Sequence, residues 1–220
     1  QIIGSMLCNR NADEPHLVVV RSTLLENWRR ELKKFAPEFK VLIHHGSDRT
    51  GNYKTFFDYD VVITSYGSIV RDLPIFKMLK WNIVSLDEAQ DIKNPLAQRT
   101  QTIKKLKRNS SISITGTPLE NTLLDLWSIM DFSNNGYLGS KQEFEEIYMM
   151  SESEQVSLEP VIRPLMLKRE VSEVASQLPE RIVIPVYLTM HAARKEMYHS
   201  IRERIREQYS GSPTLAAITA

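Results

Sequence analysis

Two adjacent carboxylates, Asp87 and Glu88, are the residues of this chain whose types and placement best suit chemistry. They follow an apolar run at residues 81–86 that predicts a strand, and open α/β sheets bind ligands at the carboxyl ends of their strands. One carboxylate could hold Mg²⁺ through water, because this ion prefers oxygen ligands and keeps much of its hydration. The other could orient the water that attacks a γ-phosphate. Asp87 suits the first role and Glu88 the second, although a strand that ends in solvated acids would look the same.

A second polar segment, residues 113–121, follows the next predicted strand. Small hydroxyl residues there, such as Thr115, would lie at a strand-to-helix turn and could bond to the acidic pair. Thr117, Pro118 and Glu120 also match a capping box with proline at the first helical position, which alone would explain the segment as a helix start. Two such segments on successive strands favour a functional pair.

Short β-branched apolar runs predict the sheet that positions these residues. The strands are expected at residues 17–20, 41–43, 61–64, 83–86 and 112–114. Nearly continuous apolar runs suit a sheet buried on both faces, and the helical stretches between them predict parallel βαβ units in an α/β fold. Thr23 and Glu26 form a capping box before Trp28, Leu32 and Phe35, which recur on one helical face.

The second half of the chain has a different character. A turn after Phe132 leads into short polar helices up to about residue 164, which predict a helical attachment to the α/β core. A strand is expected at residues 182–188, and a strongly charged helix at about residues 192–208.

Composition sets limits on the possible partners. The 220 residues are 42% hydrophobic and 25% charged with a net charge of +1, so any DNA binding must come from local placement of charge. The single cysteine excludes an intramolecular disulfide, and the apolar runs are too short to cross a bilayer, so no membrane partner is expected. Residues 1–7 resemble the middle of a helix, and both ends are abrupt, which favours a fragment of a longer chain.

The motifs together resemble the Swi/Snf family of helicase-like motors. The string Asp-Glu-Ala-Gln at residues 87–90, with Lys-Asn at 93–94, matches the family's acidic box, and Thr-Gly-Thr-Pro at 115–118 with Glu-Asn at 120–121 matches its next motif. Residues 22–28 and 62–66 are similar to its two DNA-contacting motifs. Residues 126–140 resemble the start of its helical protrusion, so the resemblance covers nearly the whole chain.

The resemblance implies a RecA-like parallel sheet flanked by helices, with an appended helical protrusion. Residues 1–132 would form the first ATPase lobe, 133–178 the protrusion and connector, and 179–220 the start of the second-lobe region. The parent protein would be a DNA-dependent ATPase that uses ATP and Mg²⁺ to translocate on double-stranded DNA. Its targets would be protein–DNA complexes such as nucleosomes or RNA polymerase, in a nucleus or in the cytoplasm and nucleoid of a bacterium.

The resemblance also implies roles for individual residues. Asp87 and Glu88 would be the catalytic residues: Asp87 would hold Mg²⁺ through water, and Glu88 would orient the attacking water. Gln90 would join them in binding the nucleotide. The remaining site residues would contact the DNA backbone or couple it to the nucleotide: Ser22, Thr23, Thr64, Ser65, Tyr66, Thr115, Gly116 and Thr117.

Three features depart from the family pattern. Arg21 stands where the family commonly has proline, and we interpret it as a surface charge rather than a phosphate contact. Lys168 replaces one arginine of a usual pair. The sequence contains no Gly-x-x-x-x-Gly-Lys-Ser/Thr loop, which the family carries just upstream of a helix like residues 1–7. The chain alone is therefore expected to hydrolyse ATP poorly or not at all.

Other residues invite a functional interpretation that we do not favour. The basic run at residues 104–108 would be a solvated helix end, where cations suit the helix dipole. His44 and His45 lack partners at metal-binding spacing and are expected to be structural. Trp28 and Trp127 are expected in the core, and Cys8 is expected to be inert.

Two alternatives remain beside the translocase hypothesis. The chain could belong to another superfamily-two motor, such as a restriction-type translocase or an RNA helicase, although the Thr-Gly-Thr-Pro form argues against the latter. It could also be a non-catalytic lobe kept as a DNA- or protein-binding module, against which the intact acidic pair argues mildly.

Overall fold

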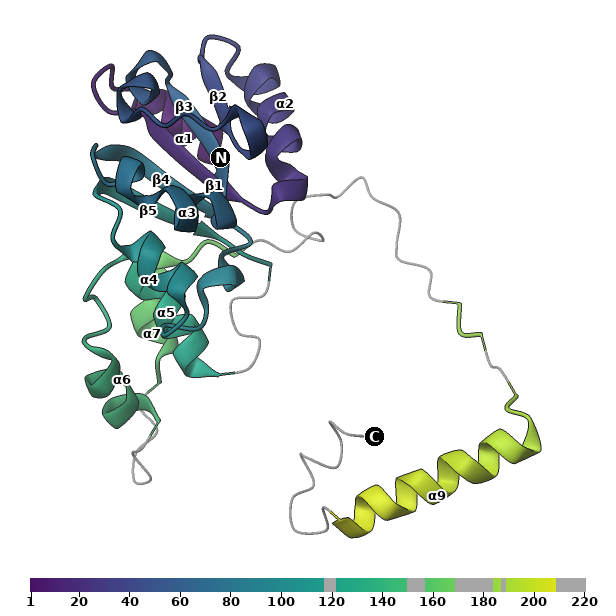
Figure 1. The fold of residues 1–220 in the computed structure, drawn as a ribbon. Coiled ribbons are helices and arrows are strands. Elements are labelled where there is room, and N and C mark those ends of the chain that lie inside the picture. The colour runs from purple at the N-terminus through teal and green to yellow at the C-terminus, as the bar shows by residue number, and fades with distance from the viewer. Residues whose placement is uncertain (117–121, 150–156, 169–183, 187–188, 209–220) are drawn as a thin grey trace. The chain divides into compact units, whose positions relative to one another are not determined.

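The computed structural model describes residues 1–116, 122–149, 157–168, 184–186 and 189–208. Within them the chain forms a five-stranded sheet in the order β2-β3-β1-β4-β5 (Figure 1). The strands are β1 (His16–Val20), β2 (Val41–His44), β3 (Val61–Ser65), β4 (Trp81–Asp87) and β5 (Arg108–Ile114). Every pairing is parallel, so the five predicted strands and the α/β fold class are confirmed.

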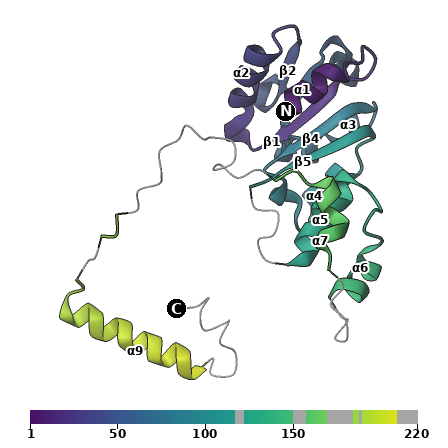
Figure 2. The same ribbon diagram turned by 180° about the vertical axis from the view of Figure 1, so that it is seen from behind.

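Helices cover both faces of the sheet, which explains why the strand sequences do not alternate. The helices are α1 (Ile2–Cys8), α2 (Leu25–Phe35), α3 (Tyr66–Phe76), α4 (Gln98–Lys104) and α5 (Leu123–Ser133). Along β1, Leu17 and Val19 pack with residues of α3, α4 and α5, whereas Val18 and Val20 pack with α1 and α2. Figures 1 and 2 show these two layers from opposite sides. Because successive side chains of a strand point to opposite faces, both sets must be apolar.

The start of α2 differs from the prediction. The expected capping box is wrong, because the chain first makes a short 3-10 turn, η1 (Ser22–Leu24), and α2 begins at Leu25 without a side-chain cap. Glu26 instead pairs with Arg29, with 2.8 Å between guanidinium nitrogen and carboxylate oxygen. On the predicted apolar face Leu32 is fully buried, but Phe35 is 56% exposed.

The start of α5 also differs. The helix that carries Trp127 and Met130 begins at Leu123, not at Pro118, because Thr122 supplies the cap: its hydroxyl accepts a hydrogen bond from the Asp125 backbone N–H at 3.3 Å. Thr117 and Glu120, which were expected to cap it, lie outside the described residues. Trp127 is 8% exposed and donates to the Gly139 carbonyl at 3.2 Å, so its predicted place in the core is confirmed.

Short helices follow α5, as expected. They are α6 (Lys141–Tyr148), α7 (Glu159–Ile162) and the 3-10 turn η5 (Arg163–Leu165). The first begins with a true capping box, in which the Ser140 hydroxyl and the Glu143 carboxylate each accept the other residue's backbone N–H. The chain divides into two compact units, residues 1–165 and 166–220. The predicted boundaries near residues 132 and 178 stay predictions.

The second unit contains the expected charged helix, α9 (Ala192–Gln208). Of the strand predicted at 182–188, the structure describes residues 184–186, which are not in a strand; the rest lie outside the described residues. In the part of the chain that the structure describes, no helix is long and apolar enough to cross a membrane.

The basic run after α4 is not a simple solvated helix end. Lys104 donates to the Asp131 carboxylate at 2.7 Å. Arg108 lies 4.2 Å above the Phe132 ring and donates to the Phe132 carbonyl at 2.7 Å. The prediction of a solvated face is therefore wrong for Lys104 and Arg108, because both tie β5 and α4 to α5. They also line a hollow of about 440 Å³ at the start of β5, away from the acidic pair.

Candidate functional site

The parallel register brings the predicted site residues to one edge of the sheet. Val20 at the end of β1 lies opposite Ser65 at the end of β3, and Asp87 at the end of β4 lies opposite Ile114 in β5. The turns after β1, β3, β4 and β5 are therefore neighbours, as expected for a doubly covered parallel sheet. The carboxyl ends of these four strands and the segments that directly follow them carry all the proposed site residues that the structure describes.

The turn after β4 holds Glu88 in an unusual backbone conformation. Its φ and ψ are 54° and 53°, in the left-handed region that residues with a side chain rarely adopt. Among the described residues, no other non-glycine residue has a positive φ. Such strain persists only where the surroundings hold it, and it concentrates at functional sites.

Tyr66 is one of the groups that hold this turn. Its hydroxyl donates to the Asp87 carbonyl at 2.8 Å and approaches the Glu88 carbonyl at 3.4 Å. The side chain is 3% exposed, and burial raises the pKa of its phenol above the ordinary value, so it remains a neutral donor. Tyr66, the first residue after β3, therefore positions the backbone of the acidic pair.

The Asp87 carboxylate is bonded through both of its oxygens. Oδ1 accepts the Glu88 backbone N–H at 3.0 Å, and Oδ2 accepts the Trp28 indole N–H at 2.7 Å. The Trp28 ring packs against the core, as expected, but it is only partly buried, and its indole N–H reaches the acidic pair, which the sequence did not predict. The helical period suggested an apolar face for Trp28, and only the adjacency of β1 and β4 in the sheet reveals the contact.

Glu88 is linked to the turn after β5 through Gln90. The Gln90 amide nitrogen donates to the Glu88 carboxylate, and the Thr115 hydroxyl donates to the Gln90 amide oxygen at 2.8 Å. The contact expected between a hydroxyl of the second motif and the acidic box is thus present, by way of one amide. Gly116 is exposed beside it, and Thr117 lies outside the described residues.

Arg21 is an ion-paired residue at this edge. Its guanidinium lies 3.3 Å from the Asp91 carboxylate, which also lies 3.5 Å from Arg99. Asp91 is the main reason that the pKa of Arg21 is raised. The side chain is 50% exposed, in agreement with a surface charge.

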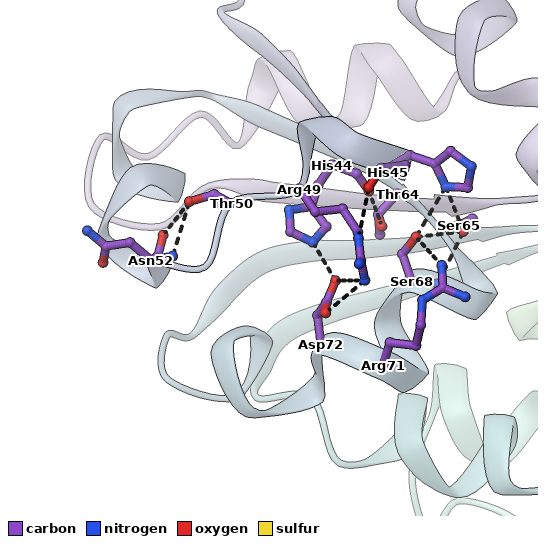
Figure 3. Close-up of polar contacts among 11 residues, drawn as sticks. His44, His45, Arg49, Thr50, Asn52, Thr64, Ser65, Ser68, Arg71 and Asp72 are labelled. Atoms are coloured by element: carbon purple, nitrogen blue, oxygen red, sulfur yellow. Dashed lines mark hydrogen bonds and ion pairs between the residues drawn. The ribbon is translucent and has the colours of Figure 1, made fainter.

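The residues expected to contact DNA fall into two groups. Ser22 and Thr23 are exposed residues of η1. Thr64 is fully buried and donates to the His44 carbonyl at 2.8 Å, while the Ser65 hydroxyl caps α3 and lies 3.1 Å from a His45 ring nitrogen (Figure 3). Because these hydroxyls and that of Tyr66 are used inside the protein, any DNA contact of residues 64–66 must come from the backbone.

The two histidines are structural, as expected. The His44 ring is buried and lies against Phe56 and Phe76. It shares the Asp72 carboxylate with Arg49, at 2.9 Å and 3.1 Å (Figure 3). Desolvation lowers the pKa of His44, although Asp72 opposes the shift. His45 lies between the hydroxyls of Ser65 and Ser68.

Asp87 borders a hollow of about 350 Å³ in which a ligand could meet its carboxylate. The other lining residues come from α1, α2 and β5: Gln1, Ile2, Ile3, Asn27, Trp28, Glu31 and Ile114. The oxygen donors of Asp87 suit Mg²⁺, which prefers carboxylates and retains water. In the described part of the chain no group of three or more acidic, histidine or cysteine side chains could hold a metal, so such an ion would take its other ligands from water and phosphate.

Comparison with known proteins defines the class to which this fold and site belong. The chain matches the SNF2-related domain over residues 2–216. It therefore belongs to the SNF2-related family, and both the Swi/Snf resemblance and the RecA-like fold class are confirmed.

Similar proteins occur in bacteria and eukaryotes. The chain is 38% identical over 198 residues to a putative ATP-dependent helicase/translocase, YwqA, of Bacillus subtilis, covering 85% of this chain and 22% of that protein. It is 31% identical to the ISWI chromatin-remodeling complex ATPase ISW2 of Saccharomyces cerevisiae, covering 96% of this chain and 20% of that one. The Sulfolobus solfataricus SWI2/SNF2 ATPase core in complex with dsDNA is similar with a TM-score of 0.69 and 32% identity, covering 96% of this chain and 45% of that structure. The chain thus spans about a fifth of the length of the Bacillus and Saccharomyces proteins.

Proposed function

We propose that this chain is the first ATPase lobe of a DNA-dependent motor that hydrolyses ATP to translocate on double-stranded DNA. The observation that carries the proposal is the strained turn at Glu88, which is held by Tyr66 and linked through Gln90 to Thr115. A solvated strand end would need neither the strain nor the partners. The printed names of the relatives, an ATP-dependent helicase/translocase and a chromatin-remodeling ATPase, support the same class.

Each group at the site has a proposed task in the reaction. Asp87 would hold Mg²⁺ through water, and the ion, when bound with ATP, would neutralise charge on the phosphates. Glu88 would accept a hydrogen bond from the attacking water and aim its oxygen at the γ-phosphorus. The bond between the water oxygen and the γ-phosphorus would form as the bond between the γ-phosphorus and the bridging β-phosphate oxygen breaks. The proton of the water would pass to Glu88 and then to the released phosphate, and ADP and phosphate would leave. Gln90 would fix the Glu88 carboxylate and report its state to Thr115.

DNA would bind at the same edge of the sheet, beside the nucleotide. Ser22 and Thr23 are the exposed hydroxyl residues there, and hydroxyls and backbone amides are common phosphate contacts. Such contacts follow the backbone rather than the base sequence, as a motor that moves along any DNA requires. Gly116 and Thr117 would complete this surface.

The parent protein would supply what this chain does not contain. A phosphate-binding loop and a second RecA-like lobe would complete the nucleotide site, and the whole motor would act on protein–DNA complexes such as nucleosomes or RNA polymerase. Its location would be the nucleus or, in a bacterium, the cytoplasm and nucleoid.

The test is ATP hydrolysis by the parent protein with duplex DNA, single-stranded DNA and RNA, with Glu88→Gln as the control. We expect strong stimulation by duplex DNA and a loss of roughly 10²-fold or more in the variant, as for a positioned base. Stimulation by RNA alone would favour an RNA helicase. No hydrolysis with any nucleic acid would overturn the proposal and leave a DNA- or protein-binding module.

A further inference from the structure

Trp28 occupies a position between the two parts of the proposed site. It lies in α2, which starts directly after η1, the turn that exposes Ser22 and Thr23. Its indole N–H ends on Asp87 at the tip of β4, 59 residues further along the chain. No other side chain in the described residues donates a hydrogen bond to this carboxylate.

The bond has the geometry of a strong hydrogen bond. Its length of 2.7 Å is at the short end for an N–H donor, as expected when the acceptor is ionised. An indole N–H is a donor only, so it cannot rotate into an alternative role as a hydroxyl could. The ring itself is partly buried against the core cluster that includes Val18, Leu25 and Ile63, and this packing limits its movement.

The hydrogen bond leaves the carboxylate accessible to a ligand. Asp87 and Trp28 both line the hollow of about 350 Å³, so one side of the acid faces the indole and another faces open space. A carboxylate that is hydrogen-bonded by a rigid neighbour is the usual arrangement behind a metal-binding or water-binding acid.

We propose that Trp28 is a positioning residue that orients Asp87 for Mg²⁺ and connects this carboxylate to the DNA-facing turn at Ser22 and Thr23. The inference rests on the proposed function. Because α2 is a single helix, a displacement of η1 by bound DNA changes the position of the indole, and the indole changes the position of the acid. The nucleotide site is thereby connected to DNA by a second route, separate from Gln90 and Thr115.

The experiment uses the full-length parent protein with Trp28→Phe, which keeps an aromatic ring and removes the N–H. Trp127→Phe is the matched control, because Trp127 is also a packed tryptophan whose N–H donates, at 3.2 Å, to a group outside the site. ATP hydrolysis is measured against Mg²⁺ concentration, with and without duplex DNA. DNA affinity and thermal unfolding are measured in parallel.

We expect Trp28→Phe to raise the Mg²⁺ concentration for half-maximal hydrolysis, or to lower the DNA-stimulated rate, by about tenfold, as substitutions behind metal ligands typically do. The basal rate should fall less than the stimulated rate, and DNA affinity should stay within about twofold. Trp127→Phe should lower the melting temperature without changing the Mg²⁺ requirement.

Two results would overturn the inference while the proposed function stands. One is an unchanged Mg²⁺ requirement and unchanged DNA stimulation in Trp28→Phe. The other is an equal loss in both variants that follows their melting temperatures, which would mean a packing role only. If Trp28→Phe does not fold, the isosteric analogue with sulfur in place of the indole N–H answers the same question. A wild-type parent without DNA-stimulated hydrolysis would instead refute the proposed function itself.

Discussion

Two polar networks lie at the same edge of the sheet and differ in what they leave open. At the β2–β3 side, Asp72 is shared by Arg49 and the buried His44, and Ser65 is bonded within the protein (Figure 3). At the β4–β5 side, Asp87 and Glu88 accept hydrogen bonds, and Asp87 also borders a hollow. The first network uses buried groups to fix the structure, whereas the second, in the function proposed above, would hold acids in place for a ligand.

Backbone geometry separates the two networks as well. The β4–β5 network contains Glu88 at φ 54°, whereas the positive φ values elsewhere in the described chain belong to glycines. A left-handed conformation costs an L-residue on the order of 1–2 kcal/mol. This strain at Glu88 lowers the stability of the folded chain. Strain of this kind is expected where a protein gives up some stability for activity.

The largest effect should come from replacing Glu88 by glycine. The variant should lose at least about 10² in DNA-stimulated hydrolysis, because the water-orienting carboxylate is gone. Its free energy of unfolding should be unchanged or raised by up to about 1 kcal/mol, because glycine adopts this φ without strain. Denaturant unfolding and ATPase assays on the same preparation measure both. A clear loss of stability would mean that Glu88 is structural. The two networks would then not differ in role.

Asp72→Ala should show the opposite pattern. The change leaves the His44 ring buried without its Asp72 partner and removes one of the two acceptor groups of Arg49, so the free energy of unfolding should fall by about 2 kcal/mol. Hydrolysis per folded molecule should stay within about twofold. Asp13→Ala, at an exposed loop acid, is the control. A selective loss of activity with unchanged stability would show that the β2–β3 network also takes part in the reaction.

The β2–β3 network should also make the stability of the protein depend on pH, through His44. Burial lowers the pKa of His44 below its ordinary value of 6.5 in the folded protein. As the pH falls through about 6.5, the unfolded chain takes up this proton and the folded chain resists it, so stability is lost, by at most about 1.4 kcal/mol per pH unit. Unfolding curves between pH 7.5 and 5 should show this slope, reduced in His44→Leu. An identical slope in the variant would assign the pH dependence to other groups.

Tyr66→Phe tests the turn itself with a smaller change. The ring stays in the core, but the Asp87 carbonyl loses its donor at 2.8 Å, which should cost about 1 kcal/mol of stability. Hydrolysis should fall a few-fold, because the acidic pair is less firmly held. Tyr59→Phe, outside this edge of the sheet, serves as the reference. No effect on hydrolysis would mean that the remaining contacts suffice to hold the turn.

The sequence predicted most of the fold and part of the site, for identifiable reasons. Apolar runs such as residues 61–64 are local signals, so the five strands were found. A bond from a hydroxyl of the second motif to the acidic box was expected from two motifs on successive strands, and Thr115 makes it through Gln90. Trp28 was assigned to the core because a helical period reports burial of a ring, not the direction of its N–H. The burial of Thr64 and Tyr66 depends on neighbouring strands and helices that no short motif contains.

The smallest expected effect concerns the exposed turn at Ser22 and Thr23. Replacing both by alanine should weaken duplex binding by the parent protein a few-fold and equally for different sequences, because phosphate contacts carry no base information. The dependence of affinity on salt should be unchanged, since neutral hydroxyls release no counterions. It should also be unchanged in Arg21→Ala, because this guanidinium is paired with Asp91, and a slope lower by about one would instead show a phosphate contact. Binding titrations at several salt concentrations separate the two cases. Unchanged affinity in both variants would mean that η1 does not contact DNA. The proposed connection from η1 through α2 to Asp87 would then also be wrong.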